Sequence, residues 1–382
     1  MAIEINDYLF VLGRDIELGK AEVFVLLHSM NIEYKISFQK ERILVLSIKN
    51  NVDTNYLINR LGGTVKIGRI ISVNSNLEQD LRKIEIPDNK KIQFSLSVYN
   101  NSQLATRVKE IFGNILKDEH IKFTYKTFVN SESPKKLHKT GYGIIDLVVF
   151  SYYVALTISV SDPRAYKLLE ERPENDFLKI TSTRLAKILI NLSGAKENQT
   201  LLDPFCGIGA ILQNAMLMKL NVIGIDNDKQ SVMQTRKNLE WTKKRFNLKN
   251  NFKIIEGDSR NINRHLEKNF VDIVVTEPYL GPYIRKTLSL KEARKLCNEL
   301  ESLYSKFFES LKYVIKDNSR VVFIAPRFKT KESKLCGLDM GRVFGKPYRQ
   351  IEIPHLNKNS ITFYGINKKI IREIYIIVSN YS

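Results

Sequence analysis

The segment that most constrains this chain is residues 201–210, where an apolar strand ends in an acid and a glycine-rich turn opens a helix. The turn reads Asp203-Pro204-Phe205-Cys206-Gly207-Ile208-Gly209. In open α/β sheets, ligands bind outside the carboxyl ends of the strands, where such a loop lies. The two glycines let the backbone approach a ligand closely, and Asp203 can accept a hydrogen bond from a ligand amine. A dinucleotide fingerprint needs a third glycine where Leu212 stands, so the loop does not favour a pyrophosphate.

From Thr181 onward, short apolar strands alternate with helices, which is typical of a parallel, doubly wound sheet. We expect these strands at 200–202, 222–225, 252–255, 271–275, 320–325 and 373–378. The preceding part differs, because strands and helices there mix with short connections, as in an α+β module. Residues 162–176 hold two prolines and several charges. We therefore predict an α+β domain over 1–162, a linker over 163–180 and a Rossmann-like domain over 181–382.

Two further strands also end in acids, at Asp226 and Asp258, each followed by a small polar residue, Asn227 or Ser259. An acid at the end of the second strand can hold both hydroxyls of a ribose. The acid of the third strand is placed to receive an adenine amine. Together with Asp203, these acids suit a ligand with a ribose, an adenine and an amine end, and S-adenosylmethionine fits this description. The alternative is that such acids only cap the helices that follow.

The fourth strand runs into Thr276-Glu277-Pro278-Tyr279. Methyltransferases that act on amino groups keep a loop here with Asp, Asn or Ser, then two prolines and an aromatic residue. A base amine is a poor nucleophile because its lone pair is delocalised into the ring. An oxygen that accepts the amine's hydrogens localises that lone pair, the aromatic ring stacks on the base, and a proline keeps the loop rigid.

These segments resemble the tRNA guanosine N(2)-methyltransferases that modify position 10 of tRNA and carry an N-terminal THUMP (tRNA-binding) module. The resemblance implies a class I methyltransferase domain, S-adenosylmethionine as cofactor, and tRNA as substrate. The cofactor residues it implies are Asp203, Phe205, Gly207, Gly209, Asp226, Asn227, Asp258 and Ser259. The matching segments are 181–186, 190–192, the loop 203–209, Asp226, Asp258, 277–279 and 372–375, with 8–14 and 61–67 in the N-terminal half.

The fourth-strand loop departs from the family's Asp-Pro-Pro-Tyr. Either Thr276 takes the first position, or the loop is reshaped so that Glu277 supplies the acceptor. We favour Glu277, because a carboxylate is the better acceptor. Pro278 and Tyr279 complete the expected catalytic set.

The charge of the chain favours a polyanionic partner. Lys and Arg number 60 against 41 Asp and Glu, a net charge of +19. The clearest basic cluster of the N-terminal half contains Lys135, Lys136 and Lys139. Arg327 follows a strand on the active-site side, where it can contact a phosphate. We expect these four residues to bind tRNA or another structured RNA; the alternative is a solvated surface.

The three cysteines, 206, 297 and 336, lie far apart in the sequence. Such a set argues against a disulfide framework and a zinc site, and for a reducing compartment. The longest apolar stretch, 147–160, is interrupted by polar residues and falls short of the ~20 that span a bilayer. We therefore expect a cytoplasmic protein that needs neither a metal nor a membrane.

The sequence thus predicts methyl transfer from S-adenosylmethionine to a base amine of RNA, with the 2-amine of a tRNA guanosine favoured. One alternative is an adenine-amine methyltransferase that acts on RNA or DNA. Another is a catalytically silent RNA-binding protein that keeps the methyltransferase fold.

Overall fold

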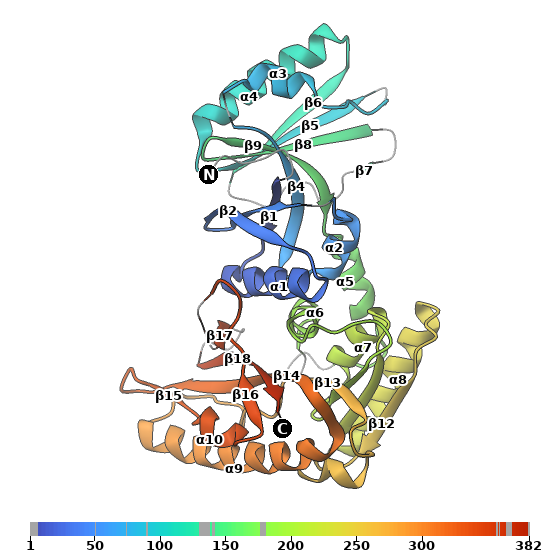
Figure 1. Ribbon diagram of the computed structural model, residues 1–382, viewed down its shortest axis with the longest axis vertical. Coiled ribbons are helices and arrows are strands. Elements are labelled where there is room, and N and C mark those ends of the chain that lie inside the picture. Colours follow the sequence, from blue (N-terminus) through green and yellow to red (C-terminus); the bar gives the residue numbers. More distant parts are fainter. Residues whose placement is uncertain are drawn as a thin grey trace. The chain divides into compact units, whose positions relative to one another are not determined.

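The computed structural model describes residues 7–49, 51–73, 75–88, 91–129, 138–139, 142–175, 181–356, 358, 360–363 and 369–380. The chain divides into two compact units (Figure 1). The first comprises Met1–Gly19 and Asn31–Ala165, and the second comprises Lys20–Met30 and Tyr166–Ser382. Helix α5 (Pro163–Glu170) lies in the first half of the segment expected as a linker. The division at 1–162, 163–180 and 181–382 stays a prediction.

The first unit is built on one mixed sheet in the order β2-β3-β1-β4-β9-β8-β5-β6, with β7 beside β8. Its strands are β1 (Asp7–Leu12), β2 (Tyr34–Lys40), β3 (Ile43–Ile48), β4 (Thr64–Ser72), β5 (Ile92–Tyr99), β6 (Phe123–Val129), β7 (His138–Lys139), β8 (Tyr142–Phe150) and β9 (Tyr153–Val160). Its helices are α2 (Thr54–Arg60), α3 (Leu77–Arg82) and α4 (Ser102–Asp118), and α1 (Ile16–Ser29) begins in it. The expected α+β class is confirmed, and β2, α2 and α3 are elements that the sequence patterns did not predict.

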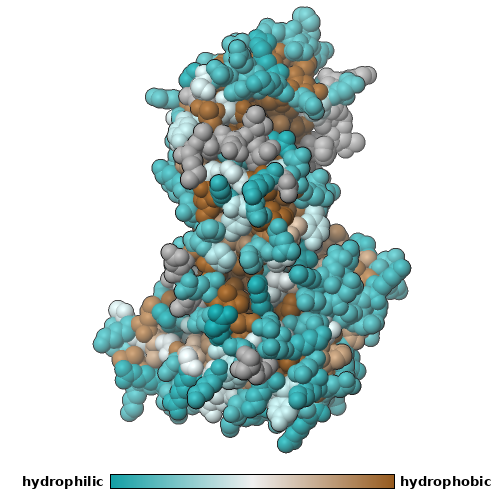
Figure 2. All heavy atoms as spheres, viewed as in Figure 1, coloured by the Kyte–Doolittle hydropathy of each residue, from teal (hydrophilic) through white to brown (hydrophobic). Residues whose placement is uncertain are grey.

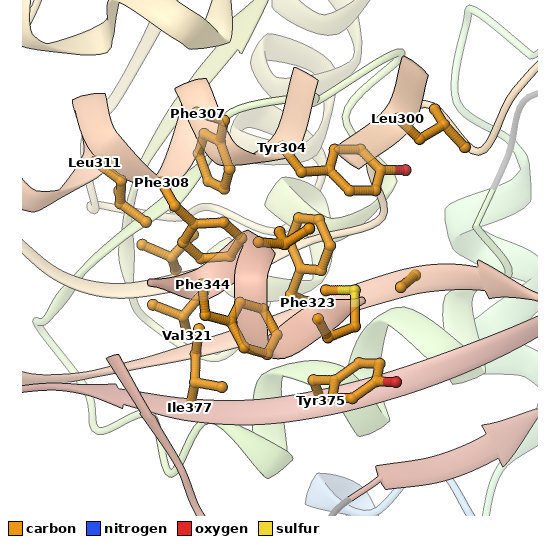
Figure 3. Packing of buried hydrophobic residues seen from close by; sticks show 14 of the residues in the cluster. Leu300, Tyr304, Phe307, Phe308, Leu311, Val321, Phe323, Phe344, Tyr375 and Ile377 are labelled. Atoms are coloured by element: carbon orange, nitrogen blue, oxygen red, sulfur yellow. The ribbon is translucent and has the colours of Figure 1, made fainter. Parts of the chain in front are cut away.

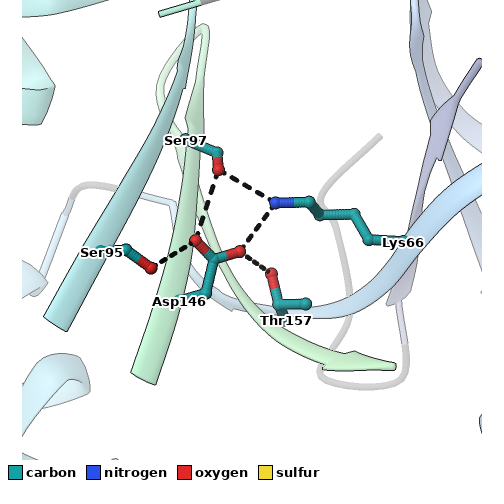
Figure 4. Close-up of polar contacts among 5 residues, drawn as sticks. All are labelled: Lys66, Ser95, Ser97, Asp146 and Thr157. Carbon is teal, nitrogen blue, oxygen red and sulfur yellow. Dashed lines mark hydrogen bonds and ion pairs between the residues drawn. The ribbon is translucent and has the colours of Figure 1, made fainter. Parts of the chain in front are cut away.

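A buried polar network joins four strands of this sheet (Figure 4). Nζ of Lys66 on β4 lies 2.7 Å from Oδ2 of Asp146 on β8 and 2.9 Å from Oγ of Ser97 on β5. Ser95 and Thr157 donate further hydrogen bonds to the two carboxylate oxygens, at 2.8 and 2.6 Å. Both ionic side chains are almost completely buried. Burial lowers the pKa of Lys66, and the charge of Asp146 opposes this shift.

The second unit contains a sheet in the order β12-β11-β10-β13-β14-β18-β16, with β15 beside β14 and β17 beside β18. Its strands are β10 (Thr200–Asp203), β11 (Asn221–Asp226), β12 (Phe252–Glu256), β13 (Val271–Thr276), β14 (Ile315–Lys329), β15 (Leu335–Gly337), β16 (Tyr348–Gln350), β17 (Ser360–Phe363) and β18 (Ile370–Ser379). Its helices are α6 (Thr183–Leu192), α7 (Ala210–Leu217), α8 (Lys229–Arg245), the 3₁₀ helix η1 (Ser259–Arg264), α9 (Leu290–Val314) and α10 (Met340–Phe344).

The order of the parallel strands reverses between β10 and β13. The chain proceeds from β10 through α7, β11 and α8 to β12 in one direction, and from β13 through α9 to β14 in the other. Right-handed crossovers in opposite directions place their helices on opposite faces of the sheet, which makes the fold doubly wound as expected. The carboxyl ends of β10 and β13 therefore flank the topological switch point, where such sheets bind ligands.

The sheet is not wholly parallel, which corrects one expectation. β18, predicted over 373–378, runs antiparallel to β14, with Phe323 opposite Tyr375. A strand buried on both faces reads as the same apolar run in either direction, so the sequence pattern did not reveal its orientation. β15, β16 and β17 also pair antiparallel and were not predicted.

The core of the second unit lies between α9 and the strands β14 and β18. Phe307 and Phe308 project from α9 toward Phe323 on β14, and Phe344 and Tyr375 extend the aromatic cluster (Figure 3).

The outer side of α8 is hydrophilic (Figure 2), and the last turn of this helix contains Lys243, Lys244 and Arg245. Among the described residues no helix is long and apolar enough to cross a membrane.

Candidate cofactor and active site

The switch point brings together the ends of β10 and β13. Asp203 is the last residue of β10 and Thr276 is the last residue of β13. Oγ1 of Thr276 donates a 2.7 Å hydrogen bond to Oδ1 of Asp203. Because both side chains are buried, this bond fixes the carboxylate between the two strand ends.

Asp203 has an unusual titration behaviour for a carboxyl group. Burial raises its pKa to about 7, and the negative charges of Asp226 and Glu277 act in the same direction. The hydrogen bond from Thr276 and one from the backbone N–H of Phe205, at 3.2 Å, oppose this shift. A buried carboxyl group of this kind is a ready partner for a cationic ligand group, which would favour its ionised form.

A glycine turn follows β10 and leads into α7. Gly207 and Gly209 both have positive φ angles, +52° and +86°, which glycine adopts without strain. A Cβ atom on Gly207 would point into open space, whereas one on Gly209 would lie 3.0 Å from the Thr235 side chain. The N–H of Gly207 donates to Oδ2 of Asp226 at 2.8 Å. The turn and the end of β11 are thus joined into one rim.

The other acids differ in their surroundings. Asp226 accepts at Oδ1 from the N–H of Asp228, while Asp228 itself caps α8 and Asn227 is exposed beside them. Asp258 instead caps η1, and Arg260 contacts both of its carboxylate oxygens. This ion pair lowers the pKa of Asp258. Asp258 thus caps a helix, as the alternative interpretation of the acids held, and its contact with a cofactor stays a prediction.

Glu277 is held at both oxygens. Oε1 lies 2.5 Å from Nε of Arg372 on β18, and Oε2 accepts a 2.6 Å hydrogen bond from Oγ1 of Thr181. The Glu277 side chain is 12 % exposed. Thr276 differs, because its hydroxyl donates to Asp203. Which of Thr276 and Glu277 takes the first loop position stays a prediction.

The rest of the expected catalytic loop is anchored on α9. Pro278 is buried, and the hydroxyl of Tyr304 donates to the carbonyl oxygen of Tyr279 at 2.7 Å. Burial raises the pKa of Tyr304 well above its usual value, so this hydroxyl stays a donor. The Tyr279 ring is 54 % exposed. This exposure leaves room for the predicted stacking on a base, which stays a prediction.

The surroundings of the other predicted residues leave their cofactor and RNA roles as predictions. The Phe205 ring packs edge-on against Phe307 of the core, with centroids 5.5 Å apart, and Ser259 is buried. Arg327 forms a 2.8 Å ion pair with Glu373. Lys135 and Lys136 lie outside the described residues, and Lys139 belongs to β7. The RNA-contact role of these four residues stays a prediction.

The cysteines are all free and buried. Burial raises the pKa of the Cys206 thiol well above its usual value, which makes it a poor nucleophile. Cys297 and Cys336, 39 residues apart, bring their sulfur atoms to 3.6 Å. Within the described ranges, no group of three or more His, Cys, Asp or Glu side chains could hold a metal ion.

Three residues of the site were missed as functional candidates: Thr181, Arg372 and Tyr304. Thr181 and Arg372 stand in segments that matched the family, but nothing in those segments indicated a contact with Glu277. These partners are 96 and 95 residues from Glu277. Only the fold brings them together, Arg372 from β18 and Thr181 from the segment before α6.

Comparison with known proteins identifies a methyltransferase domain in this chain. The RMKL-like methyltransferase domain family matches residues 177–343, and a DNA methylase family matches residues 86–237. The probable tRNA (guanine(10)-N2)-dimethyltransferase of Methanothermococcus thermolithotrophicus is 35 % identical over 127 residues, which are 32 % of this chain and 74 % of that protein. This chain belongs to the tRNA (guanine(10)-N2)-dimethyltransferase family. The family recognised from the sequence is confirmed.

A second member of the tRNA (guanine(10)-N2)-dimethyltransferase family, from Methanothermobacter thermautotrophicus, is 35 % identical over 152 residues. The match spans 40 % of this chain and 40 % of the length of that relative. Among solved structures, TrmN from Thermus thermophilus has a TM-score of 0.53 and 13 % identity, covering 98 % of this chain and 99 % of its own. This likeness concerns the fold, and it agrees with the Rossmann-like domain expected from the sequence.

Proposed function

We propose that this protein transfers a methyl group from S-adenosylmethionine to the 2-amine of a guanosine in tRNA. The cofactor would lie along the rim formed by the glycine turn and the ends of β10, β11 and β12. When bound, it supplies an electrophilic methyl group on a sulfonium.

The residues of the rim fit such a cofactor. Gly207 leaves open space above the turn. Asp203, whose pKa of about 7 reflects burial, suits the amine end. Asp226 is half-exposed, and each of its oxygens already accepts one backbone hydrogen bond, which leaves acceptor capacity for ribose hydroxyls. Arg260 contacts both oxygens of Asp258, so Asp258 would receive the adenine amine once the exposed Arg260 side chain turns away.

The observation that most favours guanine is the way in which Glu277 is held. Arg372 and Thr181 each use one acceptor direction, on different oxygens, so each oxygen retains a second one. Guanine offers two adjacent donors, N1–H and the 2-amine, which match a pair of carboxylate oxygens. Adenine has an acceptor, N1, beside its amine. The second carboxylate oxygen would therefore face a nitrogen that also carries a negative partial charge.

The same arrangement explains how the amine becomes nucleophilic. The Glu277 carboxylate would accept an amine hydrogen and stabilise the positive charge that develops on nitrogen as the C–N bond forms. The bond from the methyl group to sulfur breaks in the same step, which leaves a neutral thioether, and the carboxylate would take up the proton that the methylated nitrogen releases. Tyr279 stacks on the base, and the buried Pro278 keeps the loop rigid. The Arg372 and Thr181 contacts orient the carboxylate before the base arrives, which reduces the cost of reorganisation.

The tRNA partner follows from the family and from charge. We propose that the first unit is a THUMP-like tRNA-binding module, with Lys135, Lys136 and Lys139 contacting phosphates and Arg327 contacting one near the site. The net charge of +19 supports a polyanionic partner. Three unpaired thiols are in keeping with action in the cytoplasm.

Digestion of tRNA to nucleosides, after incubation with the purified protein and methyl-labelled S-adenosylmethionine, tests this proposal. We expect the label in N2-methylated guanosine. Label in methyladenosine would favour the adenine-amine alternative. Absence of label, with cofactor and tRNA both bound, would favour the catalytically silent RNA-binding protein.

A further inference from the structure

The loop that follows Pro278 exposes a second aromatic ring. Tyr283 is 76 % exposed, the largest exposed fraction of any large hydrophobic side chain among the described residues. It stands four residues beyond Tyr279, whose ring is also exposed. An aromatic ring displayed in this way on a positively charged protein is a candidate surface for a nucleic-acid base.

The backbone that presents Tyr283 is anchored on both sides. Before it, Gly281 has a φ of +102°, and a Cβ at this position would lie 3.1 Å from the Leu296 side chain of α9. After it, Ile284 is buried in the core of the second unit. The carbonyl oxygen of Arg285 accepts a 2.5 Å hydrogen bond from Nζ of Lys369. The outward direction of the ring is therefore set by a packed loop.

The charge beside this ring suits RNA. The exposed side chains of Arg285 and Lys286 follow Ile284, and residues 278–288 include no acid. Cations next to an aromatic ring form the combination that binds unpaired nucleotides, because the ring stacks on the base while the cations contact the neighbouring phosphates.

We propose that Tyr283 stacks on the base of a nucleotide adjacent to the target guanosine, with Arg285 and Lys286 on the flanking phosphates. This inference rests on the proposed function. A target base must leave its stack to reach Glu277, and its neighbour then loses a stacking partner. Tyr283 replaces that partner, while Tyr279 serves the target base itself.

The test is tRNA binding by the full-length protein without cofactor, for Tyr283→Ala, Tyr283→Phe and a matched control, Tyr313→Ala. Tyr313 is 52 % exposed at the far end of α9. Loss of one stacked base weakens binding by about 5- to 150-fold, so we expect this for Tyr283→Ala and near wild-type affinity for the other two variants. Unchanged binding by Tyr283→Ala, or equal losses for Ala and Phe, would overturn the proposal.

A fluorescent base locates the contact. 2-Aminopurine placed next to the target guanosine should be quenched on binding to the wild-type protein and not on binding to Tyr283→Ala. Quenching that survives in this variant would contradict the assignment. The two proposals can fail separately. If the wild-type protein labels no guanosine, the proposed function is contradicted. If the wild-type protein labels guanosine and Tyr283→Ala binds tRNA normally, only the role of Tyr283 is contradicted.

Discussion

Nε of Arg372 lies 2.5 Å from Oε1 of Glu277, which joins the last long strand of the sheet to the loop after β13. The family's loop begins with Asp, and the longer Glu277 reaches this guanidinium while Thr181 binds its other oxygen. The carboxylate is thereby fixed in orientation. This contact is the basis of the first two predictions.

Glu277→Gln keeps the shape of the side chain and one acceptor oxygen but removes the charge. We expect single-turnover methylation to fall by about 10²-fold, because the carboxylate stabilises charge that develops only in the transition state. Binding of tRNA and of S-adenosylmethionine, measured separately, should remain near wild type. A variant with wild-type turnover would remove Glu277 from the reaction.

Arg372→Lys keeps the positive charge but loses the planar guanidinium that donates from Nε. If Arg372 positions Glu277, kcat should fall about tenfold with little change in KM for either substrate. Arg349→Lys, on the exposed part of β16, is the matched control and should behave like wild type. A rise in KM with kcat unchanged would mean that Arg372 binds substrate rather than positioning Glu277.

Thr276→Val preserves volume and removes the donor to Asp203. Without this hydrogen bond the pKa of Asp203 rises further, so S-adenosylmethionine affinity at neutral pH should drop about tenfold, in the range expected for a lost bond to a buried group. At saturating cofactor, turnover should stay close to wild type. The opposite pattern, lost turnover with normal cofactor affinity, would give Thr276 the first position of the loop.

Asp203 makes stability depend on pH. Burial raises its pKa from 3.8 to about 7, because the folded protein favours the neutral carboxyl group. The contribution of this group to the unfolding free energy is therefore fully present below about pH 4 and is lost as pH rises through 7. Between these values, the unfolding free energy of the wild type should fall relative to Asp203→Asn by up to about 1.4 kcal/mol per pH unit. Denaturant titrations at several pH values measure this difference, and parallel curves for the two proteins would contradict it.

We expect the sheet of the first unit to lose stability when the buried Lys66–Asp146 ion pair is broken. Asp146→Asn leaves the Lys66 ammonium buried without its counter-charge, which costs about 3–5 kcal/mol. Hydrogen exchange of the β4 and β8 amides should accelerate accordingly. Glu33→Gln, which breaks the exposed pair with Lys49, should leave these amides unchanged. Equal protection in both variants would show that the buried pair does not stabilise the sheet.

Much of the site could be predicted from local sequence because its acids end apolar strands. Asp203 and Asp226 lie where that pattern indicated, at adjacent strand ends. The turn itself was predictable from the two glycines that follow the strand, and the structure adds that both have positive φ angles.

What the sequence did not reveal depends on strand direction and on distant contacts. The apolar run of β18 gave no indication that it runs antiparallel to β14, yet the strand as placed there contacts the Glu277 loop through Arg372. A local contact was also missed: Asp226 is the last residue of β11, whereas Asp258 lies two residues beyond β12 and pairs with Arg260. The proximity of Cys297 and Cys336 arises only when β15 packs near α9.

The most direct test of the account replaces the methyl acceptor and nothing else. Once mapping of nuclease fragments of the labelled tRNA has located the methylated guanosine, a tRNA with inosine at that position lacks only the 2-amine there. The rate of methyl transfer from labelled S-adenosylmethionine to the two tRNAs is then compared at equal protein and tRNA occupancy. The account predicts transfer to the guanosine tRNA and none to the inosine tRNA. Equal transfer to both would contradict it, because the methyl group would then go to an atom other than the amine that faces Glu277.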